Sequence, residues 1–358
     1  MTPSRQHTVS QVTASQATPV QTTGDQTMGD QTTGDQTMGG LAGPPAFRRP
    51  PRVFRGYALD LDGTVYLGGK LLPGAAETIA SIRAEGSRLV FLTNNPLRSP
   101  ASYARALSSL GIPAEPGDVV TPLGVLTAYL AGRHPGRPVL TVAEPLVDET
   151  LAAAGIPVTS HPAEAGVVVV SFDRTFSYDK LLSAYRAVRH SGAVIVATNP
   201  DPFCPTPDGG LPDCAAMLAA VEACTEARAE AIMGKPSEHM AAELLRRLGV
   251  EAGEAAIVGD RISTDVAMSR SMGMTSVLVL SGVTAADEAA SSPQHPDYVI
   301  DGIAALLPDE LLPDAPRPTE GSSDDRVRVH ADPARPDRGQ PDRRLPGDPP
   351  VWFALCRV

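Results

Sequence analysis

Two aspartates one residue apart, Asp60 and Asp62, are the residues of this sequence most suited to chemistry. They lie in the segment Asp60-Leu61-Asp62-Gly63-Thr64, directly after a short apolar run. Gly63 permits a turn there, and a hard cation between the carboxylates would offset a repulsion of about 1 kcal/mol in water that grows several-fold in a cleft. An EF-hand loop also begins Asp-x-Asp, but its twelfth position would be Leu71 instead of the glutamate that binds calcium. We interpret the pair as a cation-binding turn, with an acidic surface turn as the alternative.

Two more groups of polar residues are suited to binding an anion. Thr93-Asn94-Asn95 follows an apolar run and offers a hydroxyl and two amides that can hydrogen-bond phosphate oxygens and a substrate chain. Lys235, in Gly234-Lys235-Pro236-Ser237, lies at a predicted helix start beside free amide groups, which suits a phosphate. Each pattern is weak alone, because Asn-rich turns and solvated lysines are common.

A further acidic group is Gly259-Asp260-Arg261-Ile262-Ser263-Thr264-Asp265, which also follows an apolar run. Asp260 can supply another metal carboxylate. Asp265 lies five positions later, where it can orient Lys235 or a metal-bound water. It can equally satisfy the amide groups of a helix N-terminus, and the two uses are compatible.

These groups are positioned by strand and helix signals that alternate over residues 53–308. Apolar runs predict strands, and segments with helical spacing lie between them: strands at 58–59, 89–92, 167–170, 194–197, 255–258 and 277–280, and helices at 75–85, 99–111 and 237–248 among others. Apolar runs that are continuous rather than alternating indicate a parallel sheet covered on both faces. Sites in such sheets form at the carboxyl ends of the strands, which is where the polar groups lie.

The two ends of the chain differ in composition from this middle. Residues 1–52 are rich in Thr, Gln, Gly and Pro and contain a five-residue repeat at 22–36, and residues 311–358 are rich in Pro and alternating charges. Such segments cannot bury enough apolar surface to offset the entropy lost on ordering. We therefore predict disordered tails at both ends.

Charge and hydropathy exclude several classes of partner. The formal net charge of −11 disfavours binding to nucleic acid or to an anionic membrane. No apolar run approaches the ~20 residues of a membrane helix, and the first ten residues lack the apolar centre of a signal peptide, so we expect a cytoplasmic location. The four cysteines, Cys204, Cys214, Cys224 and Cys356, match no zinc or redox spacing and are expected to be free thiols, with a thiol that lines a pocket as the alternative.

In chain order, Asp60-x-Asp62-Gly63, Thr93, Lys235 and Gly259-Asp260 to Asp265 resemble the four motifs of the haloacid dehalogenase-like hydrolases. The motif sequences are similar to those of the NagD-type (subclass IIA) phosphatases of that superfamily: Asp-x-Asp-Gly-Thr, Thr-Asn-Asn, Gly-Lys-Pro and Gly-Asp-Arg-x-x-Thr-Asp. The joint pattern is specific, although each motif alone is weak, and it covers about residues 54–308.

The spacing of the motifs agrees with a two-domain α/β protein. About 140 positions separate Thr93 from Lys235, which is far more than a simple crossover needs. We predict a Rossmann-like parallel-sheet core at 53–135 and 232–310, with a second domain inserted at 136–231. The resemblance implies that this insertion is the large α/β cap (C2 type) that closes over the substrate. It also implies a homodimer formed through the cap.

The resemblance further implies a mechanism. Asp60 would attack phosphorus and form an aspartyl-phosphate, and Asp62 would protonate the leaving oxygen and then activate water. Mg²⁺ would be held by the carboxylates of Asp60 and Asp260 and by the backbone carbonyl of Asp62.

The remaining motif residues are assigned on the same basis. Thr93 and Lys235 would stabilise the charge of the transferring phosphoryl group. Asn94 and Asn95 would contact phosphate or substrate, and Asp265 would support the site from behind.

The segment Pro212-Asp213-Cys214 in the predicted cap bears on the substrate. Family members often have Pro-Gly and a small residue there, whereas this wording looks closer to the sugar-phosphate branch, such as the phosphatase of arabinose operons. Asp213 can accept sugar hydroxyls, or it can cap a helix beginning near Ala215. We expect a Mg-dependent phosphatase of a small phosphorylated metabolite, with a sugar phosphate favoured. Pyridoxal phosphate, phosphoglycolate or a nucleotide are alternative substrates, and a non-catalytic metabolite-binding regulator is the alternative function.

Overall fold

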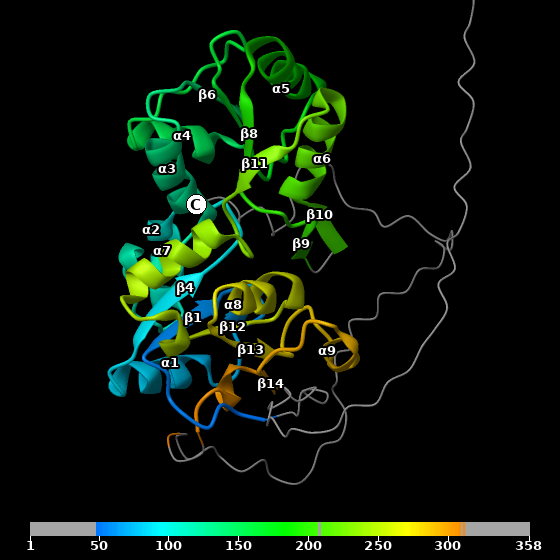
Figure 1. Ribbon diagram of the computed structural model, residues 1–358. Helices are drawn as coiled ribbons and strands as arrows, with labels where there is room; N and C mark the ends of the chain where they lie inside the picture. Colours follow the sequence, from blue (N-terminus) through cyan, green and yellow to red (C-terminus); the bar gives the residue numbers. More distant parts are fainter. Residues whose placement is uncertain (1–47, 207–208, 309–310, 312–358) are drawn as a thin grey trace, which may run out of the picture. The chain divides into compact units, whose positions relative to one another are not determined.

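The computed structural model describes residues 48–206, 209–308 and 311 (Figure 1). Most of the two predicted tails lies outside these residues. Contacts with the first sheet begin before the predicted core boundary at 53: the backbone amide of Arg48 donates to the carbonyl of Val299 at 3.2 Å. The side chain of Arg52 also reaches the carbonyl of Gly253, at 3.2 Å. No helix in the described ranges is long and apolar enough to cross a membrane.

The first sheet consists of six parallel strands in the order β14-β13-β12-β1-β4-β5. Its strands are β1 (Gly56–Asp60), β4 (Arg88–Leu92), β5 (Val119–Val120), β12 (Ala255–Gly259), β13 (Thr275–Val279) and β14 (Tyr298–Ile300). Strand β1 lies between β12 and β4, and all five of its residues are buried. A central strand covered on both faces explains why its apolar residues are continuous.

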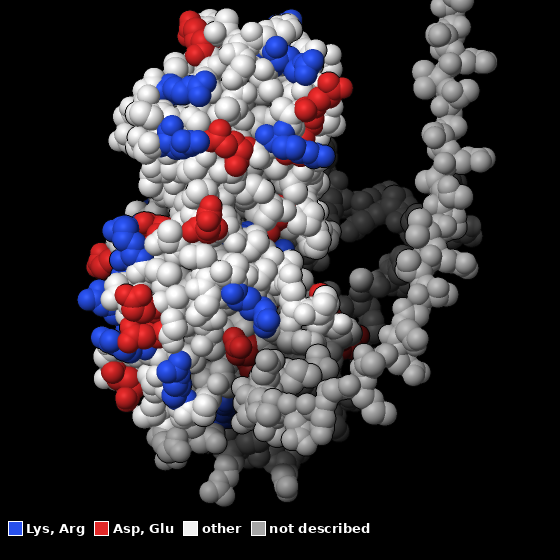
Figure 2. Space-filling model, in the orientation of Figure 1, with Lys and Arg blue, Asp and Glu red and all other residues white. Residues whose placement is uncertain are grey.

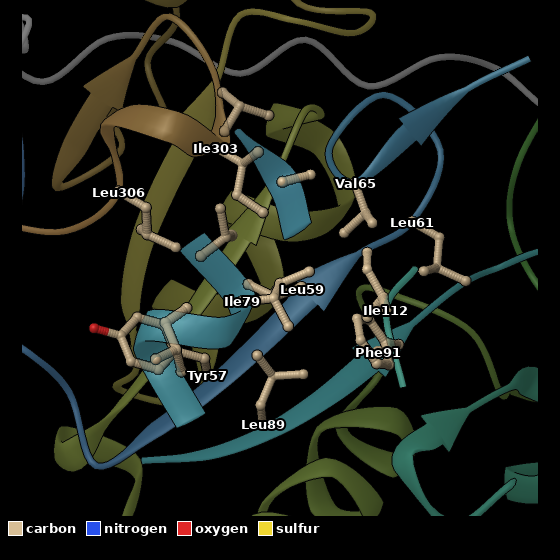
Figure 3. Packing of buried hydrophobic residues seen from close by; sticks show 14 of the residues in the cluster. Tyr57, Leu59, Leu61, Val65, Ile79, Leu89, Phe91, Ile112, Ile303 and Leu306 are labelled. Carbon is tan, nitrogen blue, oxygen red and sulfur yellow. The ribbon is translucent and has the colours of Figure 1, made fainter. Parts of the chain in front are cut away.

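Helices cover both faces of this sheet. They are α1 (Ala75–Ala84), α2 (Pro100–Ser109), α3 (Pro122–Arg133), α7 (Glu238–Leu248), α8 (Ala267–Ser271) and α9 (Ala286–Ser291), with short helical turns at Pro116–Asp118, Ala252–Glu254, Ile262–Val266 and Ile303–Ala305. On one face, Leu59 and Phe91 pack with Ile79 of α1 (Figure 3). Replacing a fully buried Phe91 by Ala would cost about 3–5 kcal/mol. On the other face, Ala58 packs in a cluster that includes Leu244 of α7.

The second sheet has four parallel strands in the order β11-β8-β7-β6. They are β6 (Val139–Val142), β7 (Val167–Val170), β8 (Val194–Ala197) and β11 (Ala229–Ile232), accompanied by α4 (Pro145–Ala153), α5 (Tyr178–Ser191) and α6 (Cys214–Thr225). The four valines of β7 are all buried. Val167 and Val169 join the cluster that contains α3, whereas Val168 and Val170 pack with α5 and α6. Side chains of one strand therefore fill two cores, as the alternation of a strand requires.

Two antiparallel hairpins complete the described elements. One pairs β2 (Tyr66–Leu67) with β3 (Lys70–Leu71), just after Asp62, and the other pairs β9 (Phe203–Thr206) with β10 (Gly209–Pro212).

The predicted fold class is confirmed, with parallel sheets and covering helices. The strands of the second sheet fall within the predicted insertion at 136–231, except that β11 ends one residue later. The domain boundaries themselves stay a prediction. Figure 2 shows acidic and basic side chains interspersed on the face in view.

Candidate active site

The predicted motif residues meet at the carboxyl ends of the first sheet. Asp60 is the last residue of β1, Thr93 follows β4, and Asp260 follows β12. Because these strands are parallel neighbours, their carboxyl ends lie at one edge. Lys235 reaches the same place from the segment between β11 and α7, and its side chain is buried.

The ammonium of Lys235 links two of the aspartates. Its Nζ hydrogen-bonds the carboxylate of Asp60 and lies 2.7 Å from Oδ1 of Asp265. Burial by itself lowers the pKa of Lys235, but the carboxylates of Asp265 and Asp60 more than offset this, so the pKa is raised. Lys235 therefore stays charged.

Carboxylates outnumber this ammonium. Burial raises the pKa of Asp60 well above its usual range, Lys235 opposes the rise, and Asp265 and Asp260 add to it. The pKa of Asp260 is raised to about 6 by burial and by Asp265, although the backbone amide of Val283 donates to its Oδ2 at 2.7 Å. Three buried carboxylates beside one lysine leave a surplus of negative charge. A divalent cation would neutralise that surplus.

Two glycines give Asp260 the space that its position requires. Gly63 has a φ of +88°, and a Cβ there would lie 2.5 Å from Oδ2 of Asp260. A Cβ at Gly282 would meet the same carboxylate. Within the described ranges, no three His, Cys, Asp or Glu side chains form a metal-binding group. That the carboxylates of Asp60 and Asp260 and the backbone carbonyl of Asp62 hold a hard cation stays a prediction.

Asp62 is exposed to solvent, unlike Asp60. Desolvation by the surrounding protein and repulsion from Asp260 raise the pKa of its carboxyl to about 6. The charges of Arg98, Lys235 and Arg261 oppose that rise. A carboxyl with a pKa near neutrality suits a group that both donates and accepts a proton.

Arg98 and Arg261 are absent from the sequence-based set of site residues. Both exert their charge on Asp62, and the guanidinium of Arg261 lies over the ring of Phe203, 6.0 Å from its centroid. Their closeness to motif residues was the available signal, since Arg261 directly follows Asp260 in the chain. An arginine beside a motif is otherwise indistinguishable from a surface residue.

The Thr93-Asn94-Asn95 segment makes several contacts within the protein. Thr93 is buried, and its Oγ1 accepts from the amide of Asn95 at 3.1 Å. Oδ1 of Asn95 accepts from the amide of Leu97 at 2.9 Å, so it shapes the turn. Asn94 is hydrogen-bonded to the backbone of Lys235. The predicted substrate contacts of Asn94 and Asn95 stay predictions.

Asp213 caps helix α6 and is buried. Its Oδ1 accepts from the amide of Cys214 at 2.6 Å and from Nδ2 of Asn199 at 3.4 Å. Burial, with a further contribution from Asp201, raises its pKa to about 6. Asp213 therefore caps the helix, which begins at Cys214, one residue before the expected start near Ala215. The predicted contact of Asp213 with substrate stays a prediction.

The three described cysteines, Cys204, Cys214 and Cys224, form no disulfide bond, and Cys356 lies outside the described residues. Cys204 lies near the site: burial and then the charge of Asp62 raise its pKa to about 12. Its thiol is therefore neutral. That a cysteine lines a pocket stays a prediction.

The amino-acid sequence of this chain is similar to the sequences of known phosphatases. Residues 57–157 match a family model described as haloacid dehalogenase-like hydrolase, and residues 232–306 match a HAD-hydrolase-like model. The chain is 39% identical to the sugar-phosphatase AraL of Bacillus subtilis over 249 residues, which is 69% of this chain and 90% of that protein.

Solved structures give the same result. A glycerol phosphate phosphatase from Mycobacterium tuberculosis, in complex with magnesium, matches with a TM-score of 0.67 and 33% identity over 76% of this chain and 82% of that one. NagD from Escherichia coli K-12 matches with a TM-score of 0.66 and 27% identity over 72% of this chain and 99% of that one.

Proposed function

Because this chain belongs to the haloacid dehalogenase-like hydrolases, in their NagD-type group, and is a phosphatase, we propose that it hydrolyses sugar phosphates through an aspartyl-phosphate on Asp60 with Mg²⁺ as cofactor. The observation that carries this proposal is the charged Lys235 held against Asp60 among surplus carboxylates. An ion pair built only for stability would have balanced charges.

In the first proposed step, a carboxylate oxygen of Asp60 attacks phosphorus, and the bond from phosphorus to the leaving oxygen breaks. Asp62 gives its proton to that oxygen, which a pKa of about 6 allows. Lys235 opposes the rise in the pKa of Asp60, which favours the ionised form that attacks, and together with Thr93 it stabilises the charge on the phosphoryl oxygens.

In the second step, the Asp62 carboxylate takes a proton from water. The water oxygen attacks phosphorus, and the bond between Asp60 and phosphorus breaks to release phosphate. Asp60, Asp260 and the carbonyl of Asp62 would hold Mg²⁺, which offsets negative charge on the phosphate and the site.

The preference for sugar phosphates is supported by two features. One is the similarity to a protein named as a sugar-phosphatase. The other is Asp213, in the segment Pro212-Asp213-Cys214, which lies buried beside Asn199. Its carboxylate oxygens can accept hydrogen bonds from the hydroxyl groups of a sugar. We assign Asp213 to the insertion at 136–231, which would act as the cap, and the chemistry to the core at 53–135 and 232–310. The homodimer through the cap stays a prediction.

Phosphate release from a substrate panel tests this proposal. The panel contains arabinose 5-phosphate, glycerol 3-phosphate, pyridoxal phosphate, phosphoglycolate and AMP, each measured with Mg²⁺ and with a chelator. We expect the highest kcat/KM with a sugar phosphate and loss of activity on chelation. The nearly isosteric Asp60→Asn variant should lose about 10⁴-fold or more, because the nucleophile is removed. Equal release by both proteins would exclude Asp60 as the nucleophile. Preference for AMP or phosphoglycolate would reassign the substrate.

A thermal measurement tests the cation without relying on activity. Mg²⁺ should raise the Tm of the wild-type protein and not that of Asp260→Asn, because only a ligand that binds the folded site stabilises it. An equal shift in both proteins would exclude Asp260 as a ligand.

A further inference from the structure

The side chain of Asn94 makes two hydrogen bonds with the backbone of Lys235. Its Oδ1 accepts from the amide of Lys235 at 2.7 Å, and its Nδ2 donates to the carbonyl of Lys235 at 3.1 Å. Both groups are buried. This pair of hydrogen bonds fixes the backbone from which the ammonium reaches Asp60. A shift of this backbone would therefore move the ammonium.

The same asparagine is held by the segment that follows β8 in the second sheet. Its Nδ2 donates a further hydrogen bond to Oδ2 of Asp201 at 3.0 Å, and its backbone carbonyl accepts a hydrogen bond from Nδ2 of Asn199 at 3.0 Å. Asn199 in turn accepts from the amide of Asp201 at 3.0 Å, which closes a small network. Both hydrogens of the Asn94 amide are therefore engaged by protein groups.

Close packing at Gly234 shows that this meeting point leaves little freedom. A Cβ at Gly234 would lie 2.7 Å from Oδ1 of Asn94 and 2.9 Å from both Cβ of Asn199 and the carbonyl of Thr198. Such contacts are shorter than real Cβ atoms make. Because Gly234 has no side chain, the backbone before Lys235 can lie close to Asn94, which follows β4, and to Thr198 and Asn199, which follow β8.

We propose that Asp201 is a positioning residue for the phosphatase reaction, acting on Lys235 through Asn94. When the 199–201 segment lies against Asn94, the Asn94 amide is oriented to hold the Lys235 backbone, and the ammonium is set beside Asp60. The insertion thus contributes to catalysis through a residue that contacts neither phosphorus nor the leaving group. This inference rests on the proposed role of Lys235.

Steady-state kinetics with 4-nitrophenyl phosphate and glycerol 3-phosphate test the proposal. Asp201→Ala should lower kcat about tenfold or more with KM changed less than about twofold, because misplacing a charged group affects the transition state more than substrate binding. Asp201→Asn should recover most of kcat, since its amide oxygen can still accept from Asn94. A variant Asp201→Asn as impaired as Asp201→Ala would show that the charge of Asp201, and not its hydrogen bond, is what matters, and would overturn the proposal.

A double-mutant cycle separates action through Asn94 from direct contact with substrate. In an Asn94→Ala background, Asp201→Ala should cause little further loss of kcat, because the link is already broken. Additive losses would overturn the proposal. Asp148 is the matched control: it is a partly buried carboxylate of the insertion that accepts from Thr141 at 2.7 Å, and Asp148→Ala should leave kcat unchanged. An equal fall in kcat for Asp148→Ala would show a general effect of destabilising the insertion.

Hydrogen–deuterium exchange supplies a readout that does not depend on activity. The amide of Lys235 should exchange faster in Asp201→Ala than in the wild type, and should be unchanged in Asp148→Ala. Unchanged exchange in Asp201→Ala would overturn the proposal even if the protein is an active phosphatase. A wild-type protein without phosphatase activity would instead contradict the proposed function, whatever the exchange shows.

Discussion

Two aspartate–lysine pairs in this molecule, each with a buried aspartate, have opposite surroundings. In the second sheet's domain, Asp173 pairs with Lys180 at 2.6 Å, and its other oxygen accepts from the amide and the hydroxyl of Thr175, at 2.9 and 2.7 Å. Lys180 also donates to the carbonyl of Ala143 at 2.8 Å. Every group there has a partner and the charges balance.

The Asp60–Lys235 pair of the first sheet lacks that balance, because Asp260 and Asp265 add negative charge beside it. Both Asp60 and Asp173 lie at or after the carboxyl end of a buried parallel strand. Position in the fold therefore does not distinguish a structural pair from a reactive one. Uncompensated charge does, because a stable interior does not keep it without a function.

Removal of the lysine from each pair gives the largest expected contrast. Lys235→Met should lower kcat/KM about 10³-fold, because a preorganised positive charge at the phosphoryl group is lost. Lys180→Met should leave kcat/KM within about twofold and lower the free energy of unfolding by about 1–3 kcal/mol. Phosphate release and urea denaturation measure the two effects. Similar kinetic losses in both variants would contradict the distinction.

Two glycines with positive φ allow a smaller test of the same contrast. Gly63 has a φ of +88° and adjoins Asp260, whereas Gly68 has a φ of +56°, and a Cβ there would have no neighbouring atom within 4 Å. Gly63→Ala should lower kcat/KM about 100-fold and raise the Mg²⁺ concentration needed, because the methyl group displaces the Asp260 carboxylate. Gly68→Ala should cost only about 1–2 kcal/mol of stability from its left-handed backbone. Normal Mg²⁺ dependence in Gly63→Ala would show that Asp260 tolerates the displacement.

The ion pair between Arg174 and Glu144 in the insertion should affect stability but not activity, and its effect should be the smallest of those predicted. Arg174 donates to Glu144 through Nε at 2.5 Å and Nη2 at 2.7 Å, and these hydrogen bonds lower the pKa of Glu144. Arg174→Ala should reduce the free energy of unfolding at pH 7 by about 1 kcal/mol or less, since the pair is partly exposed. Because the folded-state pKa is the lower one, the stabilisation is present above the unfolded-state pKa and is lost as pH falls through the folded-state value.

The stabilities of the wild type and Arg174→Ala, measured by urea denaturation, should therefore converge in acid, once the pH falls below the folded-state pKa of Glu144. Arg189, 3.7 Å from the exposed Glu226, is the control, and Arg189→Ala should change stability by less than about 0.5 kcal/mol at either pH. A difference between Arg174→Ala and the wild type that persists in acid would attribute the effect to packing of the arginine rather than to its charge.

The sequence by itself determined the fold class and the motif residues of the first sheet. Apolar runs followed by Asp60, Thr93 or Asp260 predict strands and their ends, and parallel strands necessarily bring those ends to one edge. The long interval between Thr93 and Lys235 likewise predicts an inserted domain without knowledge of its contacts. The fold class could be predicted because the periodicity of apolar residues is a local property of the sequence, whereas the inserted domain stays a prediction.

Only the tertiary structure decided which of the similar residues act together. No local pattern shows that Asp201 reaches Asn94 across 107 positions of chain. The charge of Arg261 at Asp62 and the approach of Gly63 to Asp260 are likewise consequences of packing. Such contacts depend on how two sheets and their loops pack in three dimensions, and no short pattern along the chain encodes that arrangement.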